Sequence, residues 1–458
     1  MNSRKITSVL LAMVCFGTSE FVSADKPNII IVYADDMGYG DCTAYNSQSK
    51  IPTPNIDRLA KQGIRFTDAH SPGATCTASR YGLLTGTSPV RTGVLNGTAS
   101  TGPAIDSSEI TLAEMLNDQG YATHMIGKWH LGFNIPKGQR HNNLTGRLTG
   151  GPLDRGFDYF HGNDKSGPSS YPILGRSKTT KAINEITQNR ILCNDAVRII
   201  RDHAASDQIR PLFLYYALLE PHNPQVPEPE FEGTSEAGTY GDYVVQLDHW
   251  LGKVMAAIND HGLEENTLLI FASDNGASKR NLAKCPGHDG PGVLSGVKAM
   301  PLEGGHRVPM IVRWPERVIP STTSSALINQ TDLFATFADL LEVDLSSYPN
   351  SARDSYSFAA VLDAPKAAHR RPPMPVVGSY RKGKWKLIVD NYRTVSEQVK
   401  SVDLYDLNQD LSETSNLIKT HPEKAAELLN EYKQYLSTRN LKSTKTKPKR
   451  QRRSQQNK

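Results

Sequence analysis

The sequence predicts an α/β fold with a small antiparallel sheet near its C-terminal end. Apolar runs of strand length alternate with helical patterns up to residue 369, and a proline-rich break is then followed by short strand patterns and one helix. A chain of 458 residues is long enough for a large α/β enzyme domain with a smaller companion.

Four apolar or aromatic runs indicate buried strands, because each has the length of a strand and ends abruptly in polar residues. The runs are residues 29–33, 123–126, 212–216 and 268–272. The polar side chains that follow them are Asp35 and Asp36, Lys128 and His130, Glu220 and His222, and Asp274 and Asn275. Ligands of open α/β sheets bind beyond the carboxyl ends of the strands, so we expect these side chains to meet in one site.

Helical spacing of apolar residues is found between these runs, at residues 53–62, 111–117, 191–200 and 240–251. After the proline-rich residues 370–375, the strand patterns at 376–380, 385–389 and 402–406 predict a small antiparallel sheet. Residues 422–436 have apolar side chains at helical spacing, which predicts a helix that covers one face of this sheet.

The N-terminal residues 1–24 have the layout of a cleavable secretory signal, with two basic residues, an apolar stretch and a small-residue end. The mature chain is then exported to the periplasm or the extracellular space. No other stretch approaches the roughly 20 apolar residues that a membrane span needs. We therefore expect a signal peptide at 1–24, a catalytic domain at 25–369, an α+β subdomain at 370–438 and a basic tail at 439–458.

The formal net charge of +5 comes from the tail. Residues 439–458 contain nine Lys or Arg and no acid, and without them 43 basic residues face 47 acidic ones. The body is therefore mildly acidic, and no nucleic-acid partner is expected. Residues 442–453 of the tail include no aliphatic or aromatic side chain, which predicts disorder. The tail serves either as a solubilising end or as a tether to polyanions such as sulfated polysaccharide.

Cysteine usage argues against a disulfide-built scaffold. Loss of Cys15 with the signal leaves Cys42, Cys76, Cys193 and Cys285, which are too few to hold together a chain of this size. The fold must depend on a hydrophobic core. One disulfide remains possible in an oxidising compartment, and Cys193 is expected to be buried in a helix.

Two pairs of oxygen-bearing side chains indicate a metal site. Asp35, Asp36, Asp274 and Asn275 offer three carboxylates and an amide carbonyl from two strand ends. Such hard oxygen ligands suit Ca²⁺ or Mg²⁺. The alternative for any single aspartate is a turn or cap residue, but two pairs after two apolar runs favour the metal.

Residues 76–86 form the most informative segment. Cys76 begins a predicted helix directly after a turn, and Arg80 follows one helical turn later. Free N–H groups and the helix dipole favour negative charge at such an end, and Arg80 adds a fork of donors. The plain alternative is that Cys76 is a small buried apolar residue.

This segment closely resembles the first signature of the sulfatase family, in which the cysteine is oxidised to formylglycine (3-oxoalanine). Residues 120–132 resemble the second signature, which contains Lys128 and His130. Further similarity covers most of the mature body, including residues 35–41, 220–224, 273–276, 296–309, 381–387 and 404–407. The resemblance implies the large mixed sheet, flanked by helices, that sulfatases share with alkaline phosphatases.

The resemblance also implies a mechanism. Residue 76, as hydrated formylglycine, joins Asp35, Asp36, Asp274 and Asn275 around Ca²⁺, or around Mg²⁺, and one of its hydroxyls attacks sulfur. The implied roles of the other residues are sulfate binding and leaving-group assistance by Lys128, Lys298 and His222, support of formylglycine by Arg80, and removal of a proton from the second hydroxyl by His130. His124 and His306 are expected to be structural, and His288 is at most a substrate-loop residue.

One position departs from the commoner form of the signature. Ala78 replaces proline, an alternative that the family pattern allows. This leaves open which formylglycine-generating maturation enzyme modifies Cys76.

The leading hypothesis is an exported sulfuric ester hydrolase that acts on sulfated carbohydrate, and on small aryl sulfates in an assay. One alternative is a phosphonate or phosphate monoester hydrolase of the same superfamily. Another is a polyanion-binding protein with an unmodified pocket. The sugar, its linkage, endo or exo action and the oligomeric state are not encoded in any recognisable pattern.

Overall fold

The computed structural model describes residues 26–95, 98–140, 144–166, 171–178, 184–206, 210–285, 287–376, 378–390 and 399–439. The predicted signal peptide and all but the first residue of the predicted basic tail lie outside these ranges. The predicted domain boundaries stay predictions.

The centre of the molecule is a ten-stranded mixed sheet in the order β11-β2-β10-β9-β1-β8-β4-β5-β6-β7. In the same order, the ten strands span residues Thr322–Ser324, Ile64–Phe66, Met310–Arg313, Thr267–Ser273, Asn28–Ala34, Leu212–Ala217, Ala122–Lys128, Tyr159–Asn163, Pro172–Leu174 and Ser177–Lys178. The four strands predicted from the apolar runs are β9, β1, β8 and β4, which are parallel neighbours. A second pair, β3 (Ala69–His70) and β12 (Ile328–Asn329), lies apart from this sheet.

Helices cover both faces of the large sheet. Successive residues of β1 alternate between two cores, since Ile29 and Ile31 join one cluster and Ile30 and Val32 the other. One face packs against α2 (Cys76–Thr85), α4 (Leu112–Asp118), α9 (Asp332–Leu340) and α10 (Ala359–Asp363). The opposite face packs against α1 (Pro54–Gln62), α5 (Gln188–Ala204) and α6 (Gly238–Asp260).

The predicted helices are all present, with shifted ends. The pattern at 240–251 belongs to the longer α6, because its buried residues continue to Ile258. Five of the described helices were not predicted. Four of them are short, α3 (Pro89–Thr92), α7 (Lys279–Leu282), α8 (Glu303–His306) and α10, and four or five residues are too few to show a periodicity. The fifth is α9. No helix within the described ranges is long and apolar enough to cross a membrane.

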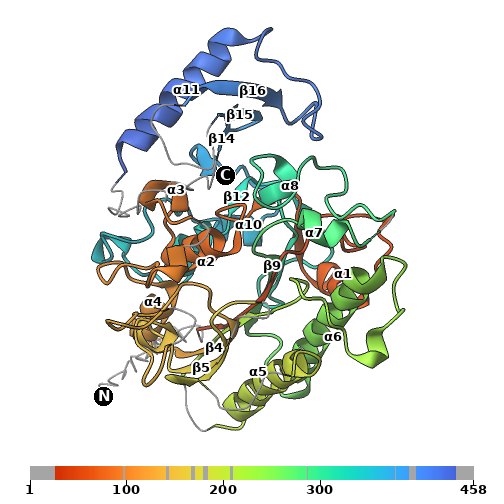
Figure 1. Ribbon diagram of the computed structural model, residues 1–458, viewed down its shortest axis with the longest axis vertical. Coiled ribbons are helices and arrows are strands. Elements are labelled where there is room, and N and C mark those ends of the chain that lie inside the picture. The colour runs from red at the N-terminus through yellow and green to blue at the C-terminus, as the bar shows by residue number, and fades with distance from the viewer. Residues whose placement is uncertain are drawn as a thin grey trace, which may run out of the picture.

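The C-terminal part is a four-stranded antiparallel sheet with one helix, as predicted. Its elements are β13 (Met374–Val376), β14 (Ser379–Lys382), β15 (Trp385–Val389), β16 (Ser401–Asp406) and α11 (Pro422–Ser437). Figure 1 shows this part in blue at one end of the molecule, with α11 laid across the sheet. The prediction of one strand at 376–380 was wrong. Gly378, with φ of 84°, lies in a turn there, and the chain reverses into the β13–β14 hairpin.

Candidate active site

Three parallel strands, β1, β9 and β4, deliver polar side chains to the same end of the large sheet. Asp35 and Asp36 follow β1, Asp274 and Asn275 follow β9, and Lys128 is the last residue of β4. Gly127 allows β4 to lie close to β8, because a Cβ at this position would be 1.8 Å from the carbonyl oxygen of Ala217. These side chains therefore meet at the carboxyl ends of the strands, where ligands of α/β sheets bind.

The predicted metal ligands form one buried cluster. The ligand atoms of Asp35, Asp36, Cys76 and Asp274 all lie within 4.8 Å of one another. The amide nitrogen of Asn275 donates to Asp36 Oδ1 at 2.9 Å. Its Oδ1 is buried and accepts no hydrogen bond from the described residues. A buried carbonyl oxygen without a donor, beside three carboxylates, fits a hard cation such as Ca²⁺ or Mg²⁺.

The backbone at Asp36 is constrained. Its φ of 75° is uncommon for a residue other than glycine. Asp36 N donates to Asp274 Oδ1 at 3.1 Å, and the next amide, of Met37, donates to Ser273 Oγ at 3.0 Å. Bonds from the end of β9 thus hold the end of β1 in a conformation that directs Asp36 into the cluster.

Cys76 is the first residue of α2, as predicted, and it is buried. Its Sγ lies 3.3 Å from Asp35 Oδ1 and 3.6 Å from Asp36 Oδ1, and Lys298 Nζ lies 3.1 Å from it. Burial, and then the nearby Asp274 carboxylate, raise the pKa of the Cys76 thiol well above its ordinary value. The thiol therefore stays protonated at neutral pH, which is unlike an activated thiolate nucleophile.

Arg80 is hydrogen-bonded to Asp274 and to the end of β4, and its predicted support of formylglycine stays a prediction. Its Nε and Nη2 donate to Asp274 Oδ2 at 3.1 and 2.8 Å, and its Nη1 donates to the Lys128 carbonyl oxygen at 3.0 Å. The guanidinium is completely buried, 5.4 Å from the centre of the Tyr33 ring. Arg80 thus fixes one of the predicted metal ligands and the end of β4.

Two lysine side chains and one histidine side chain surround the cluster. Lys128 Nζ donates to Asp35 Oδ2 at 2.6 Å. Lys298 Nζ contacts Asp36 Oδ1 as well as Cys76. His222 Nδ1 donates to the carbonyl of Asn223 at 2.6 Å, which leaves Nε2 facing Asp36 Oδ2 at 3.9 Å. Arg80, Lys128 and Lys298 balance the three aspartates, so an added divalent cation would give the cluster a net positive charge that suits an anion.

His130 lies beside this group in a left-handed backbone conformation, with φ of 53°. Its amide donates to the Asp164 carbonyl at 2.7 Å, and its ring Nδ1 is buried with no partner among the described residues. Burial, together with the charges of Lys128 and Arg80, holds the pKa of His130 well below its ordinary value. The ring is therefore neutral at neutral pH and able to accept a proton.

Asp35 remains ionised despite its burial. Burial alone would raise its pKa, but the charges of Lys128, His222 and Arg80 hold that pKa well below the ordinary value. A buried carboxylate that stays charged in this way is a ready ligand for a cation.

Comparison with known proteins agrees with this geometry. Residues 27–343 match the sequence profile of the family described as Sulfatase. The chain belongs to the sulfatase family. This sulfatase is 34% identical to N-acetylgalactosamine-6-O-sulfatase of Bacteroides thetaiotaomicron, over 89% of this chain and 92% of that protein. It is 32% identical to arylsulfatase A of Bos taurus, over 90% of this chain and 87% of that protein.

The fold comparison gives the same result. A solved structure from work on the metabolism of multiple glycosaminoglycans by Bacteroides thetaiotaomicron has a TM-score of 0.78 and 30% identity, and the match covers 90% of this chain and all of that one. The α/β fold with its small C-terminal sheet is thus that of known sulfatases, and the prediction of a sulfatase enzyme is confirmed.

The sequence missed one side chain of the sulfatase site. Ser166 Oγ donates to Asp35 Oδ2 at 2.7 Å, the same oxygen that Lys128 contacts. Ser166 lies in a loop after β5 with no periodic pattern, so nothing in the sequence alone distinguished it.

Other histidines of the sulfatase lie outside the cluster. His288 Nε2 bonds to the buried Asp41 at 2.8 Å and its side chain is only 1% exposed, which leaves it no access to substrate. His306 is buried against His70, and His124 lies within β4. The four described cysteines are free.

Proposed function

We propose that this sulfatase removes sulfate from a sulfated carbohydrate, using a formylglycine made from Cys76 and a bound divalent cation. The observation that carries the proposal is the buried cluster of Asp35, Asp36, Asp274 and residue 76, next to Asn275, whose Nδ2 donates to Asp36 and whose buried Oδ1 has no partner among the described residues. The relatives named for the 6-O-sulfate of N-acetylgalactosamine and for aryl sulfates support the substrate class.

The ligand chemistry supports the modification. Calcium and magnesium prefer oxygen ligands, and a thiol is a soft ligand that matches neither. Conversion of Cys76 to hydrated formylglycine would replace sulfur by oxygen at the one position of the cluster that lacks it. It would also supply a pair of hydroxyls, one to attack sulfur and one to release the sulfate afterwards.

The cation would be held by Asp35, Asp36, Asp274 and Asn275, together with residue 76. When bound, it would supply a fixed positive charge that favours ionisation of a hydroxyl and neutralises charge on a sulfate oxygen. Calcium is favoured over magnesium, because three carboxylates and an amide form an all-protein set of hard ligands.

The surrounding side chains would act on the ester. Lys128 and Lys298 would bind sulfate oxygens by charge-assisted hydrogen bonds, and His222 would direct Nε2 at the leaving oxygen. His130, kept neutral by its surroundings, would accept a proton at its free Nδ1. Arg80 would keep Asp274 and the end of β4 in place.

Export is part of the proposal. The apolar stretch within residues 1–24 and the small residues before Asp25 have the layout of a secretory signal. The protein would then act in the periplasm or outside the cell, after a formylglycine-generating enzyme has modified Cys76.

The decisive test measures release of inorganic sulfate and of inorganic phosphate from matched aryl esters. The protein is produced together with a formylglycine-generating enzyme, and mass spectrometry of the Cys76 peptide confirms the modification. Release of sulfate that is lost on chelation and in Cys76→Ala is expected. Release of phosphate alone would instead identify a phosphate ester hydrolase. Binding of sulfated polysaccharide without turnover of any sulfate ester would indicate a polyanion-binding protein.

A further inference from the structure

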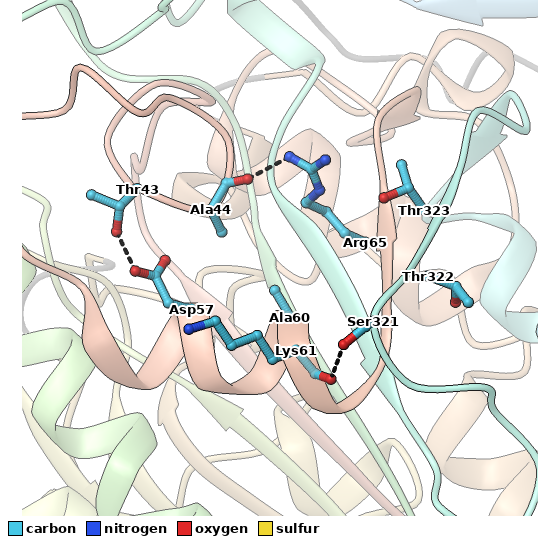
Figure 2. A pocket seen from close by; sticks show the side chains of 9 residues that line it. All are labelled: Thr43, Ala44, Asp57, Ala60, Lys61, Arg65, Ser321, Thr322 and Thr323. Carbon is cyan, nitrogen blue, oxygen red and sulfur yellow. Dashed lines mark hydrogen bonds between the residues drawn. The ribbon is translucent and has the colours of Figure 1, made fainter.

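A hollow opens at the side of the large sheet where β2 and β11 lie, and it shares no residue with the proposed metal cluster. It has a volume of about 360 Å³ and lies between α1, the loop at Thr43 and the strands β2 and β11. Figure 2 shows Asp57 and Lys61 along α1, with Arg65 on β2 beyond them. Its volume is at the lower end of the range for ligand pockets and suits one sugar unit.

The lining is polar and has no aromatic side chain. Its only apolar side chains are alanines, and the rest are hydroxyls, two cations and one carboxylate. Thr323 is the direct strand partner of Arg65, so these two side chains lie on the same face of the sheet edge. Such a lining suits a ligand rich in hydroxyls and carrying a negative charge, and it offers nothing on which a flat base could stack.

Arg65 is held in place before any ligand arrives. Its Nη1 donates to the carbonyl oxygen of Ala44, as Figure 2 shows, and its guanidinium lies 5.5 Å from the centre of the Tyr45 ring. Tyr45 is itself fixed, because its hydroxyl bonds to both the carbonyl and the amide of Met310. Within the described part of the chain, Arg65 Nη2 has no hydrogen-bond partner. A rigid cation with a free donor is a prepared site for an oxyanion.

Asp57 adds an acceptor that the protein leaves unused. Its Oδ2 accepts a hydrogen bond from Thr43 Oγ1 at 2.6 Å, whereas its Oδ1 is buried and has no partner among the residues described. Buried polar atoms are nearly always paired, so such an oxygen indicates a missing donor. A ligand hydroxyl would supply it.

We propose that this hollow is a second saccharide site, where Arg65 and Lys61 bind the sulfate or carboxylate of one sugar unit and Asp57 accepts a bond from one of its hydroxyls. The proposal rests on the proposed function, since the sugar would belong to the polymer whose sulfate esters the metal site cleaves. The hollow would hold the polymer while another unit reacts.

The first test measures the affinity for a saccharide and does not require turnover. Full-length Cys76→Ala protein is titrated calorimetrically with a chondroitin 6-sulfate octasaccharide, with and without Lys61→Met and Arg65→Met together. Loss of two charge-assisted contacts should weaken binding at least about fivefold. The control is Arg58→Met, which removes an exposed cation from the same helix outside the hollow and should leave the affinity within about twofold.

Unchanged binding in the double variant would overturn the proposal, and so would an equal loss in Arg58→Met, because the effect would then be general surface charge. The desulfated octasaccharide distinguishes the two anionic groups. A loss confined to the sulfated form assigns sulfate to the hollow, and an equal loss with both forms assigns the carboxylate. Either result supports an anionic sugar.

The second test uses enzyme with formylglycine at position 76. The ratio of kcat/KM on the polymer to kcat/KM on an aryl sulfate should fall at least about fivefold in the double variant. The fall should come from a higher KM for the polymer, because the hollow binds the polymer and takes no part in the reaction. If the unaltered enzyme releases no sulfate from any ester, the proposed function fails. The binding experiment still decides whether the hollow is a saccharide site.

Discussion

Glu220 shows how burial alone changes the behaviour of a single carboxyl group. Its Oε1 accepts hydrogen bonds from Gln246 Nε2 and Trp250 Nε1, at 3.1 and 2.9 Å, while Oε2 has no partner among the described residues. Burial raises the pKa of Glu220 to about 7, even though these two hydrogen bonds act in the opposite direction. The folded protein therefore holds a proton on Glu220 at mildly acidic pH, where the unfolded chain has lost it.

The sign of the pH effect follows from this difference. Between the ordinary pKa of glutamate and about 7, the folded state binds more protons, so the free energy of unfolding falls as the pH rises. Glu220→Gln, which mimics the protonated acid, should remove this decline. From pH 5 to pH 8 the wild type should lose roughly 2.5 kcal/mol relative to the variant. Urea unfolding at both pH values measures it, and parallel pH profiles would contradict the assignment.

Asn275 permits a prediction about the metal that does not depend on turnover. Removal of its free Oδ1 in Asn275→Ala should lower the affinity of the cluster for Ca²⁺ about tenfold or more, because one of few protein ligands is lost. Since a bound cation stabilises only the folded protein, a chelator should lower Tm of the wild type more than that of the variant. Equal metal content after dialysis against limiting calcium would exclude Asn275 as a ligand.

For single residues, the sequence allowed us to predict which side chains after regular strands belong to the site, but not which side chains in loops do. Asp35, Asp274 and Lys128 could be located because each ends an apolar run, and parallel strands bring their ends together. Ser166 could not, because no periodicity fixes where a loop places a hydroxyl. The bonding of Arg80 to Asp274 was also hidden, since those two residues are far apart in the chain.

At the scale of elements, α2 is positioned by the absence of a side chain. A Cβ at Gly82 would lie 2.3 Å from Pro72 Cβ, so glycine lets the middle of α2 lie directly on the segment that leads into it. Both Cys76 and Arg80 belong to α2. The sequence predicted α2, but not this close contact, because a single helical glycine is also compatible with an open surface.

Gly82→Ala should therefore affect activity as well as stability. Moving α2 away from Pro72 is expected to destabilise the protein by about 1–3 kcal/mol, despite the better helix propensity of alanine. It should also lower kcat through displacement of residue 76 from the proposed metal ligands. Thermal unfolding and sulfate release, measured on protein with confirmed modification, test both effects. A gain in stability would show that Pro72 moves aside at little cost.

The β13–β14 hairpin marks another limit at this scale. The run at 376–380 satisfies the apolar and aromatic composition of a strand, yet its two ends belong to antiparallel neighbours. Composition alone cannot distinguish one strand from the two arms of a tight hairpin. The long buried strands β1 and β9 were predicted well, because no turn residue interrupts them.

In the whole molecule, the C-terminal sheet is joined to the catalytic part by buried charges. Lys386 of β15 is completely buried, 2.9 Å from Glu303 of α8 and 2.8 Å from Glu413. Arg381 of β14 pairs with Asp68, which precedes β3, at 2.6 Å. The sequence gives no sign of these pairs, because their members are separated by up to 313 residues. Figure 1 shows the result, with β14 and β15 facing the end of the molecule where α8 lies.

Because these buried charge pairs join the C-terminal sheet to the rest of the protein, we expect that sheet to stabilise the entire fold. Lys386→Met would leave Glu413 buried without a cation and would remove one of the cations around Glu303, at a cost of about 3–5 kcal/mol in the free energy of unfolding. Glu303 keeps Arg307 at 3.2 Å, but Lys386 is the only cation that the described part of the chain places against Glu413. The double variant Lys386→Met with Glu413→Gln should therefore regain part of the loss.

The matched control for this prediction is Lys382→Met on the neighbouring strand β14. Lys382 is an exposed lysine paired with Glu427 and Glu431, and its loss should cost less than about 1 kcal/mol. Denaturant unfolding of the four proteins measures the effects. If Lys386→Met and Lys382→Met lowered the free energy of unfolding by the same small amount, the buried charges would not be what joins the C-terminal sheet to the rest of the protein. The apolar contacts of the C-terminal sheet, such as Leu302 against Ile388 and Tyr405, would then be sufficient.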